Sequence, residues 1–387
     1  MKTSPFLYGT TVTGSYFTNR KQEKDKLFNN LVSGINTVII SPRRWGKSSL
    51  VENVISDINK KDKNKKTVLI DMFSISNEEE FLETFAEEII KASATKLEEW
   101  ISNTKEFFKH IIPSINLGSD PYNDFSLNFS WNELKKNKNE ILNLPETIAQ
   151  KKNISFIISI DEFQNLATFS SYPTLEKAMR ASWQRQQNVT YCIYGSKRHM
   201  MSDIFNNTSK PFYRFGDIIF LQKISTEHWV DYIVGKFEKT NKQISKQNAE
   251  FIAKIMENHS WYVQQLASYV WSKTSNKAEY EEILSALTEL IYANYPFFQK
   301  EVEILSGTQL NLLKAIINNE TQLTSTSTMN KYNLGTPRNV SKNITVLMNN
   351  DLIDKTDGHY EILDPAFKLW FLNQFYKKDF DALLKTI

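Results

Sequence analysis

The chain has 387 residues with 41% apolar and 24% charged residues, a composition typical of a soluble globular protein of roughly two or three domains. A net charge of +3 is too small to indicate a nucleic-acid or membrane partner by itself, and the one cysteine, Cys192, excludes an internal disulfide and a cysteine-rich metal site. No apolar stretch approaches the roughly 20 residues that span a bilayer and the N-terminus lacks a secretory signal, so we expect a cytoplasmic protein with no membrane partner.

A helix is predicted ahead of the first strand. Residues 5–36 run from an irregular, glycine-containing segment into a helix that carries Leu27, Leu31 and Val32 on one face. Thr18 or Asn19 is the predicted N-cap of this helix, because either side chain can accept a hydrogen bond from an amide of the first turn.

A phosphate-binding loop is predicted at residues 41–49 (SPRRWGKSS). Residues 37–40 (TVII) are typical of a strand buried on both faces, and residues 47–58 place apolar side chains at helical spacing. Between them, Gly46, Lys47 and Ser48 match the closing half of the pattern G-x-x-x-x-G-K-[ST]. In such a loop, backbone amides face phosphate oxygens, the lysine neutralises β/γ charge and the serine hydroxyl coordinates Mg²⁺. The expected nucleotide contacts are Ser41, Pro42, Arg43, Arg44, Trp45, Gly46, Lys47, Ser48 and Ser49.

Ser41 stands where the pattern has its first glycine. The loop would be strained if this position required a positive φ, although serine is small and Gly46 keeps the position nearest the phosphates. The alternative interpretation is a chance G-K-S in a lysine-rich chain. The preceding strand, the following helix and an acidic pair downstream favour nucleotide binding.

The next segment predicts a second buried strand at residues 67–71 and an amphipathic helix at residues 78–91 with acidic residues in its first turn. Residues 93–130 mix glycine, proline and asparagine with aromatic residues, so we expect an insertion or hairpin on the core. A helix ending near Gln150 follows.

Two carboxylates follow a third strand. Residues 156–160 (FIISI) have the apolar character of a central parallel strand, and Asp161 and Glu162 fall at its C-terminal end, the edge where open α/β sheets bind ligands. We predict that Asp161 holds Mg²⁺ directly or through water and that Glu162 polarises the water that attacks the γ-phosphate. The alternative is a pair of N-capping acids at a strand-to-helix turn.

A further buried strand is predicted at residues 189–196 (VTYCIYGS), and Cys192 within it is interpreted as a core residue. Ser196, at the end of this strand, is the candidate sensor of the γ-phosphate. Arg198 is the candidate that neutralises transition-state charge, as an arginine finger does. Arginines after strands are also common on surfaces. The other candidates for this role are Arg180, Arg185 and Arg214.

Residues 218–221 are the last predicted core strand, and residues 225–291 repeat apolar positions at helical spacing with almost no glycine or proline. This pattern predicts an all-helical lid. Its aromatic residues Trp261, Tyr262, Tyr269 and Trp271 are interpreted as the core of the lid rather than as a base-stacking platform.

The C-terminal segment has the element order of a winged helix. Ser306 and Gln309 have capping-box form, and Thr336 precedes a proline at the first position of another helix. Residues 351–363 contain two strands joined at an Asp-Gly hairpin signal, and a last aromatic-rich helix follows Asp364.

DNA is one candidate partner of this winged helix. The helix at residues 337–349 would enter the major groove and present Arg338, Asn339, Lys342 and Asn343. Only two of these side chains are cations, and non-specific affinity depends on the number of phosphates neutralised. The alternative is that the winged helix packs against the nucleotide domain and holds it closed.

Together these motifs resemble the prokaryotic STAND-type AAA+ ATPases, the archaeal-type ATPase family. The matching segments are residues 5–9 (PFLYG), 17–23 (FTNRKQE), 41–50 (SPRRWGKSSL), 160–166 (IDEFQNL), 194–205 (YGSKRHMMSDIF) and 210–217 (KPFYRFGD). Residues 257–267 (ENHSWYVQQLA) resemble the family's His-Pro-x-Tyr helical segment, with Ser260 in place of the proline, which leaves open a nucleotide contact by His259.

The resemblance covers nearly the whole chain and implies an α/β P-loop NTPase with ATP and Mg²⁺ as ligands. Its AAA+-like core would have a five-stranded parallel sheet with flanking helices and occupy residues 1–222, with the insertion at 93–130. A helical lid at 223–300 and a winged-helix domain at 301–387 would follow. Many P-loop ATPases hold the adenine and ribose just ahead of the first strand, so Asn19 and Arg20 are expected contacts of the base.

We favour a nucleotide-dependent switch, a slow or partner-stimulated ATPase whose nucleotide state controls the position of the winged helix. Its partner would be a protein or a second copy of the chain. The alternatives are a DNA-binding ATPase resembling replication initiators and remodellers, and a non-hydrolysing, nucleotide-bound scaffold. The presence of Lys47, Ser48, Asp161 and Glu162 argues against the scaffold.

Overall fold

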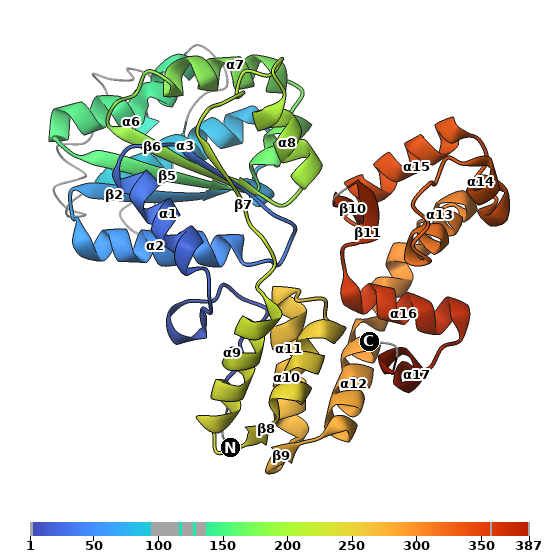
Figure 1. Cartoon of the computed structure of the whole chain (residues 1–387). Helices are drawn as coiled ribbons and strands as arrows, with labels where there is room; N and C mark the ends of the chain where they lie inside the picture. Colours follow the sequence, from blue (N-terminus) through green and yellow to red (C-terminus); the bar gives the residue numbers. More distant parts are fainter. Residues whose placement is uncertain (1–2, 94–115, 118–126, 129–136, 357, 386–387) are drawn as a thin grey trace. The chain divides into compact units, whose positions relative to one another are not determined.

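The computed structural model describes the chain except for residues 1–2, 94–115, 118–126, 129–136, 357 and 386–387 (Figure 1). The chain divides into two compact units. We call Arg20–Ser41 with Lys47–Leu221 the sheet unit, and Met1–Asn19 with Pro42–Gly46 and Gln222–Ile387 the helical unit. Within the described part of the chain, no helix has the length and apolar character needed to cross a membrane.

The sheet unit is built on five parallel strands, counted over the described residues. Their spatial order is β2-β5-β6-β1-β7, so β1 and β6 lie next to each other in the centre. This arrangement confirms the predicted α/β fold with a five-stranded parallel sheet. The strands are β1 (Thr37–Ile40), β2 (Lys65–Asp71), β5 (Ser155–Asp161), β6 (Val189–Gly195) and β7 (Asp217–Phe220).

Helices cover both faces of this sheet, as a parallel sheet requires for burial (Figure 1). On one face lie α1 (Lys21–Val32) and α2 (Lys47–Lys61). The apolar sides of the other helices join β1, β2, β5 and β6 in one buried cluster. These helices are α3 (Glu78–Ser93), α6 (Lys138–Lys152), α7 (Tyr172–Trp183) and α8 (Arg198–Asn206). Short 3-10 helices η2 (Met72–Ser74) and η3 (Phe163–Thr168) follow β2 and β5.

The segment predicted to form a helical lid is mainly helical, in line with its 3.6-residue periodicity. It contains α9 (Thr226–Glu238), α10 (Lys246–Ile255), α11 (Ser260–Lys273) and α12 (Tyr280–Glu303). The prediction of an all-helical lid is wrong in one detail, because β8 (Gln243–Ile244) pairs in parallel with β9 (Lys277–Ala278). Tyr262 and Trp271 are buried, and Trp261 and Tyr269 pack against the same core, which confirms their predicted packing role.

The winged-helix elements follow in the predicted order. They are α13 (Gly307–Ile317), α14 (Thr326–Tyr332), α15 (Pro337–Asn349), the antiparallel pair β10 (Ile353–Thr356) and β11 (His359–Ile362), and α16 (Pro365–Tyr376). The prediction that the helix after Asp364 is the last is wrong, because the short helix α17 (Phe380–Leu384) follows it. The predicted capping box is present, because Ser306 and Gln309 exchange side-chain and backbone hydrogen bonds. Thr336 and Asp364 also accept hydrogen bonds from amides of the first turns of α15 and α16.

The predicted N-cap of α1 is wrong. Arg20 occupies this position with φ 72°, and its side chain makes no capping bond within the described structure. Instead Arg20 is buried and its guanidinium donates to Glu23 Oε1 at 3.0 Å. A single-turn 3-10 helix, η1 (Gly14–Tyr16), precedes it.

Only part of the predicted insertion can be compared. From residues 93–130, the structure describes Ser93 at the end of α3 and two short strands, β3 (Asn116–Leu117) and β4 (Leu127–Asn128), which pair antiparallel. The rest of this prediction lies outside the described residues. The division into domains at 222/223 and 300/301 stays a prediction.

Candidate functional site

The segment between β1 and α2 has a loop conformation that depends on Gly46. This residue has φ 93°, a left-handed conformation in which an L side chain is strained, whereas a Cβ at this position would meet no described atom within 4 Å. Glycine is therefore needed here for its backbone freedom. Ser41 is not among the residues with positive φ, so the strain considered for this position does not arise, and Arg44 takes the second positive φ, 63°.

The loop side chains differ in exposure. Those of Ser41, Pro42, Trp45 and Ser49 are buried, and those of Arg43 and Arg44 are exposed. Within the helical unit, Arg43 Nε lies 3.4 Å from Asp351 Oδ2, and the Arg44 guanidinium lies over the Trp261 ring at 4.8 Å from its centroid. These contacts give both arginines acidic or aromatic neighbours.

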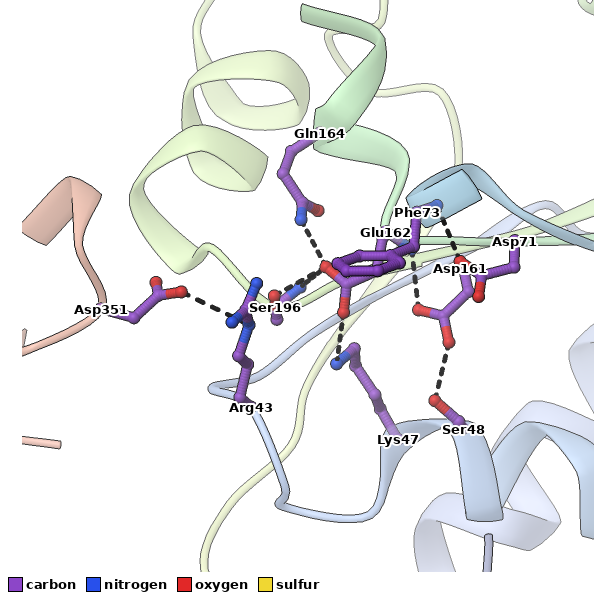
Figure 2. A network of polar contacts seen from close by, with 10 residues as sticks. All are labelled: Arg43, Lys47, Ser48, Asp71, Phe73, Asp161, Glu162, Gln164, Ser196 and Asp351. Carbon is purple, nitrogen blue, oxygen red and sulfur yellow. Dashed lines mark hydrogen bonds and ion pairs between the residues drawn. The ribbon is translucent and has the colours of Figure 1, made fainter. Parts of the chain in front are cut away.

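Ser48 and Asp161 lie in direct contact in the sheet unit. Ser48, in the first turn of α2, donates its hydroxyl to Asp161 Oδ2 at 2.7 Å (Figure 2). Asp161 ends β5, and its other oxygen accepts from the Glu162 amide at 2.7 Å. Burial raises the pKa of Asp161 to about 6, against the opposing effect of Lys47. Hydroxyl and carboxylate oxygens are the kind of ligand that Mg²⁺ prefers, so Ser48 and Asp161 fit a magnesium site.

Glu162 is the most densely contacted carboxylate of the site. Its Oε1 lies 3.2 Å from Lys47 Nζ, and its Oε2 accepts from Ser196 Oγ at 2.6 Å and Gln164 Nε2 at 2.5 Å (Figure 2). Burial raises the pKa of Glu162, but Lys47, Ser196 and Gln164 together outweigh it, and the pKa falls below its usual value. Glu162 is therefore an ionised carboxylate at neutral pH.

The sheet brings these side chains together. Asp161 ends β5, Gly195 ends β6 next to Ser196, and Lys47 begins α2 just after the loop that follows β1. Because parallel strands end at the same edge of the sheet, residues far apart in the chain meet there. Lys47, Ser48, Asp161, Glu162 and Ser196 thus form one constellation, as the sequence motifs indicate.

Gln164 belongs to this site and was not among the predicted residues. It lies in η3 directly after the two carboxylates, and its side chain is 1% exposed. Gln164 lies within the matching segment 160–166, but the sequence assigns no role to a glutamine two positions after a carboxylate. Its contact with Glu162 appears only in three dimensions.

The arginine candidates lie in different surroundings. Arg198 is the first residue of α8, two positions after Ser196, and is half-buried. Arg180 donates its Nε–H to Pro211 O at 2.9 Å and packs over Phe215, and Arg214 has its guanidinium over Tyr213. Arg185 is exposed. Proximity in the chain to Ser196 favours Arg198 among the four.

The two residues predicted to contact the base are not equivalent. Asn19 is exposed with φ 56°, whereas Arg20 is buried and paired with Glu23. Burial lowers the pKa of Arg20, and Glu23 opposes this effect.

His259 and Cys192 are both core residues. His259 is the N-cap residue of α11, 5% exposed, with its ring 5.1 Å from that of Tyr262. Burial, then the nearby Arg44 and Lys223 charges, lower the pKa of His259 to about 3. Cys192 is fully buried in β6, and burial raises the pKa of its thiol to about 12, as expected for an inert core cysteine.

On α15, Arg338, Asn339 and Lys342 are exposed. Asn343 is half-buried and its side-chain amide donates to Thr308 Oγ1 at 3.3 Å. Three of the four predicted DNA contacts therefore face solvent.

Comparison with known proteins finds a family model for the C-terminal segment and solved structures that are similar over most of the chain. Residues 296–373 match the family model described as "Probable winged helix domain". A Walker-type ATPase of Pyrococcus abyssi has a similar structure, with a TM-score of 0.66, 16% identity, and coverage of 95% of this chain and 99% of that chain.

The ORC2 protein of Aeropyrum pernix in its ADPNP-ADP complexes is also similar, with a TM-score of 0.58, 14% identity, and coverage of 93% of this chain and 94% of that chain. Its ADP form gives a TM-score of 0.54 at 13% identity, with 96% and 97% of the two chains covered. No curated protein sequence matches the chain. At these identities the likeness concerns the fold.

Proposed function

Because this chain has the fold of AAA+ P-loop ATPases that carry a C-terminal winged helix, we propose that it binds ATP with Mg²⁺ and hydrolyses it slowly. The observation that carries this proposal is the pairing of Lys47 with Glu162 and of Ser48 with Asp161 at the carboxyl edge of the sheet. A lysine, a hydroxyl and two carboxylates in this arrangement are the groups that phosphoryl transfer to water requires.

In the proposed reaction, each group has one task. The loop amides and Lys47 would bind the β- and γ-phosphates. Ser48 and Asp161 would hold Mg²⁺, which would supply positive charge to neutralise the phosphate oxygens. Glu162 orients the attacking water and accepts its proton. Lys47 now contacts Glu162, so its ammonium must turn toward the phosphates when the nucleotide binds, and this movement leaves Oε1 of Glu162 available to the water.

Ser196 and Arg198 would report the state of the γ-phosphate. Ser196 donates to Glu162, so a phosphate oxygen that competes for this hydroxyl would also change the contacts of Glu162, the proposed general base. We assign Arg198 the role of neutralising transition-state charge. We assign the contact with the base of the nucleotide to Asn19, because Arg20 is buried.

We further propose that the nucleotide state controls the position of the winged helix. Support comes from Arg43, a residue of the phosphate loop that forms an ion pair with Asp351, between α15 and β10, in the helical unit. An exposed ion pair contributes at most about 1 kcal/mol, so it can break and re-form as the loop binds phosphate. This STAND-type switch is the function that we favour.

A second candidate function is ATP-dependent action on DNA. The exposed cations Arg338 and Lys342 on α15 favour it, because they lie on the helix that would enter the major groove. A nucleotide-bound scaffold without turnover is less consistent with the site, because scaffolding does not require a buried, ionised Glu162.

Spin labels can test the switch directly. Cys192 is fully buried, so cysteines introduced at the exposed positions Lys60 on α2 and Thr345 on α15 can be labelled selectively. Double electron–electron resonance would measure the distance between the two spin labels, once with ADP and once with a non-hydrolysable ATP analogue. The proposal predicts different distance distributions, and identical distributions in the two saturated states would contradict the switch.

A further inference from the structure

One oxygen of the Glu162 carboxylate accepts hydrogen bonds from two residues, Gln164 and Ser196. Its Oε2 accepts from Ser196 Oγ at 2.6 Å and from Gln164 Nε2 at 2.5 Å, and the Ser196 amide approaches the same oxygen at 3.4 Å (Figure 2). Its Oε1 faces Lys47 instead. The two oxygens therefore have separate environments, one made of fixed neutral donors and one made of a lysine that the nucleotide can attract.

The orientation of the Gln164 amide has a cost. Its Oε1 is buried and has no hydrogen-bond partner among the residues that the structure describes. Leaving such a buried acceptor without a partner is unfavourable. The opposite orientation would place this oxygen against a carboxylate, so the contact with Glu162 determines which way the amide points.

Gly195 provides the space for this amide. A Cβ built on Gly195 would lie 2.0 Å from Gln164 Oε1 and 2.7 Å from Met201 Sδ. Gly195 does not have a positive φ, so backbone freedom does not explain the glycine. The absence of a side chain at the end of β6 allows a full-length glutamine to lie beside Glu162.

The backbone of Glu162 makes such support necessary. Its φ is 50°, a left-handed conformation that is unfavourable for a residue with a side chain. Strained residues persist when their surroundings hold them in place, and here the support consists of Gln164 and Ser196 on Oε2.

We propose that Gln164 is a positioning residue for Glu162. Its amide fixes Oε2, so that Oε1 points toward Lys47 and, in the complex with ATP, toward the attacking water. This inference rests on the proposed hydrolysis. In this assignment Gln164 acts only through the geometry of Glu162, which its amide contacts.

The test is a mutant cycle in the full-length protein. Gln164→Met keeps the approximate length of the side chain and removes the amide that donates to Glu162. Gln164→Ala is a second variant, which removes the amide and shortens the side chain. We expect kcat to fall about 10–100-fold with KM for ATP within about twofold, because a small misplacement of a catalytic group is enough to produce this loss. In a Glu162→Gln background, the same substitutions should leave the residual rate unchanged.

Gly195→Ala offers an independent route to the same defect, because its methyl group would displace Gln164. The matched control is Gly235→Ala on α9, where a Cβ would meet no described atom within 4 Å. An unchanged kcat in folded Gln164 variants would overturn the inference, as would an equal loss in the Glu162→Gln background, which indicates a merely structural role. If Glu162→Gln itself turned over ATP at the parent rate, the proposed function would fail before the question of Gln164 arose.

Discussion

Lys47 Nζ lies 3.2 Å from Glu162 Oε1, so the lysine of the predicted phosphate loop forms an ion pair with the proposed general base. Both side chains are largely buried, with 7% and 15% exposure. Removing one partner of such a pair leaves an uncompensated charge, which is unfavourable. In the proposed reaction, a triphosphate replaces Glu162 as the partner of Lys47, and this exchange would connect nucleotide binding to release of the Glu162 carboxylate.

Lys47→Ala should weaken ATP binding strongly. Hydrogen bonds to charged groups contribute about 1.5–3 kcal/mol, so we expect Kd to rise by at least about 10-fold and up to about 150-fold. Isothermal titration calorimetry with Mg-ATP measures this change. Lys60→Ala, at the exposed end of the same helix, is the control and should bind as the parent does. Equal affinities for the Lys47 variant and the parent would remove the lysine from the site.

Ser48→Ala should reduce the dependence of ATP affinity on Mg²⁺. The hydroxyl that now donates to Asp161 is the proposed metal ligand, and alanine offers no oxygen in its place. We expect the gain in affinity on replacing EDTA with Mg²⁺ to shrink about 10-fold, because the loss of one charge-assisted contact has this magnitude. Ser56→Ala, on the exposed side of α2, should keep the full gain. A normal Mg²⁺ effect in the Ser48 variant would exclude the hydroxyl as a ligand.

Stability should depend on pH through His259. Its pKa in the folded chain is about 3, below the usual value of 6.5, owing to burial and then to Arg44 and Lys223. Below pH 6.5 the unfolded chain therefore binds a proton at His259 that the folded chain does not bind. The contribution of the neutral His259 to the free energy of unfolding is fully present above pH 6.5 and is lost as the pH falls toward 3. At pH 5 this loss amounts to about 2 kcal/mol.

Chemical denaturation of the full chain at pH 7.5 and pH 5 tests this expectation. The free energy of unfolding of His259→Gln should fall by about 2 kcal/mol less than that of the parent between the two pH values. His359→Gln, at an exposed position on β11, is the matched control and should follow the parent. Parallel pH profiles for His259→Gln and the parent would show that this histidine does not titrate as described.

Duplex DNA should leave ATP turnover unchanged if the protein is a switch. The measurement is phosphate release with and without DNA, repeated with Arg338→Ala/Lys342→Ala. Two exposed cations on α15 would give a log–log salt dependence of binding no steeper than about −2. A DNA-stimulated rate that disappears in the double variant would instead favour the DNA-dependent function.

Much of the fold follows from local patterns in the sequence. The apolar runs that became β1, β5 and β6 are continuous, because strands buried on both faces need no alternation. The C-terminal helices begin where side chains such as Ser306 and Thr336 can cap them. Burial and capping are local requirements, so these predictions are confirmed.

Other features have no clear local signal. Arg20 is the N-cap residue of α1 in a left-handed conformation, against the usual capping preference, and its guanidinium is buried and paired with Glu23. The pairing of β8 with β9 involves two residues on each side, which is too short for any periodic signal. The roles of Gln164 and Gly195 depend on each other, because the Gln164 side chain fills the space that a side chain at Gly195 would occupy.

In the proposed reaction, Glu162 activates water for attack on ATP held by the phosphate loop. The most direct measurement compares Mg-ATP binding and phosphate release in the parent protein and in Glu162→Gln, using the same preparations. We predict ATP binding of similar affinity in both proteins and phosphate release slowed at least about 100-fold in the variant. Equal rates of release, or a parent protein that does not bind Mg-ATP, would contradict the account.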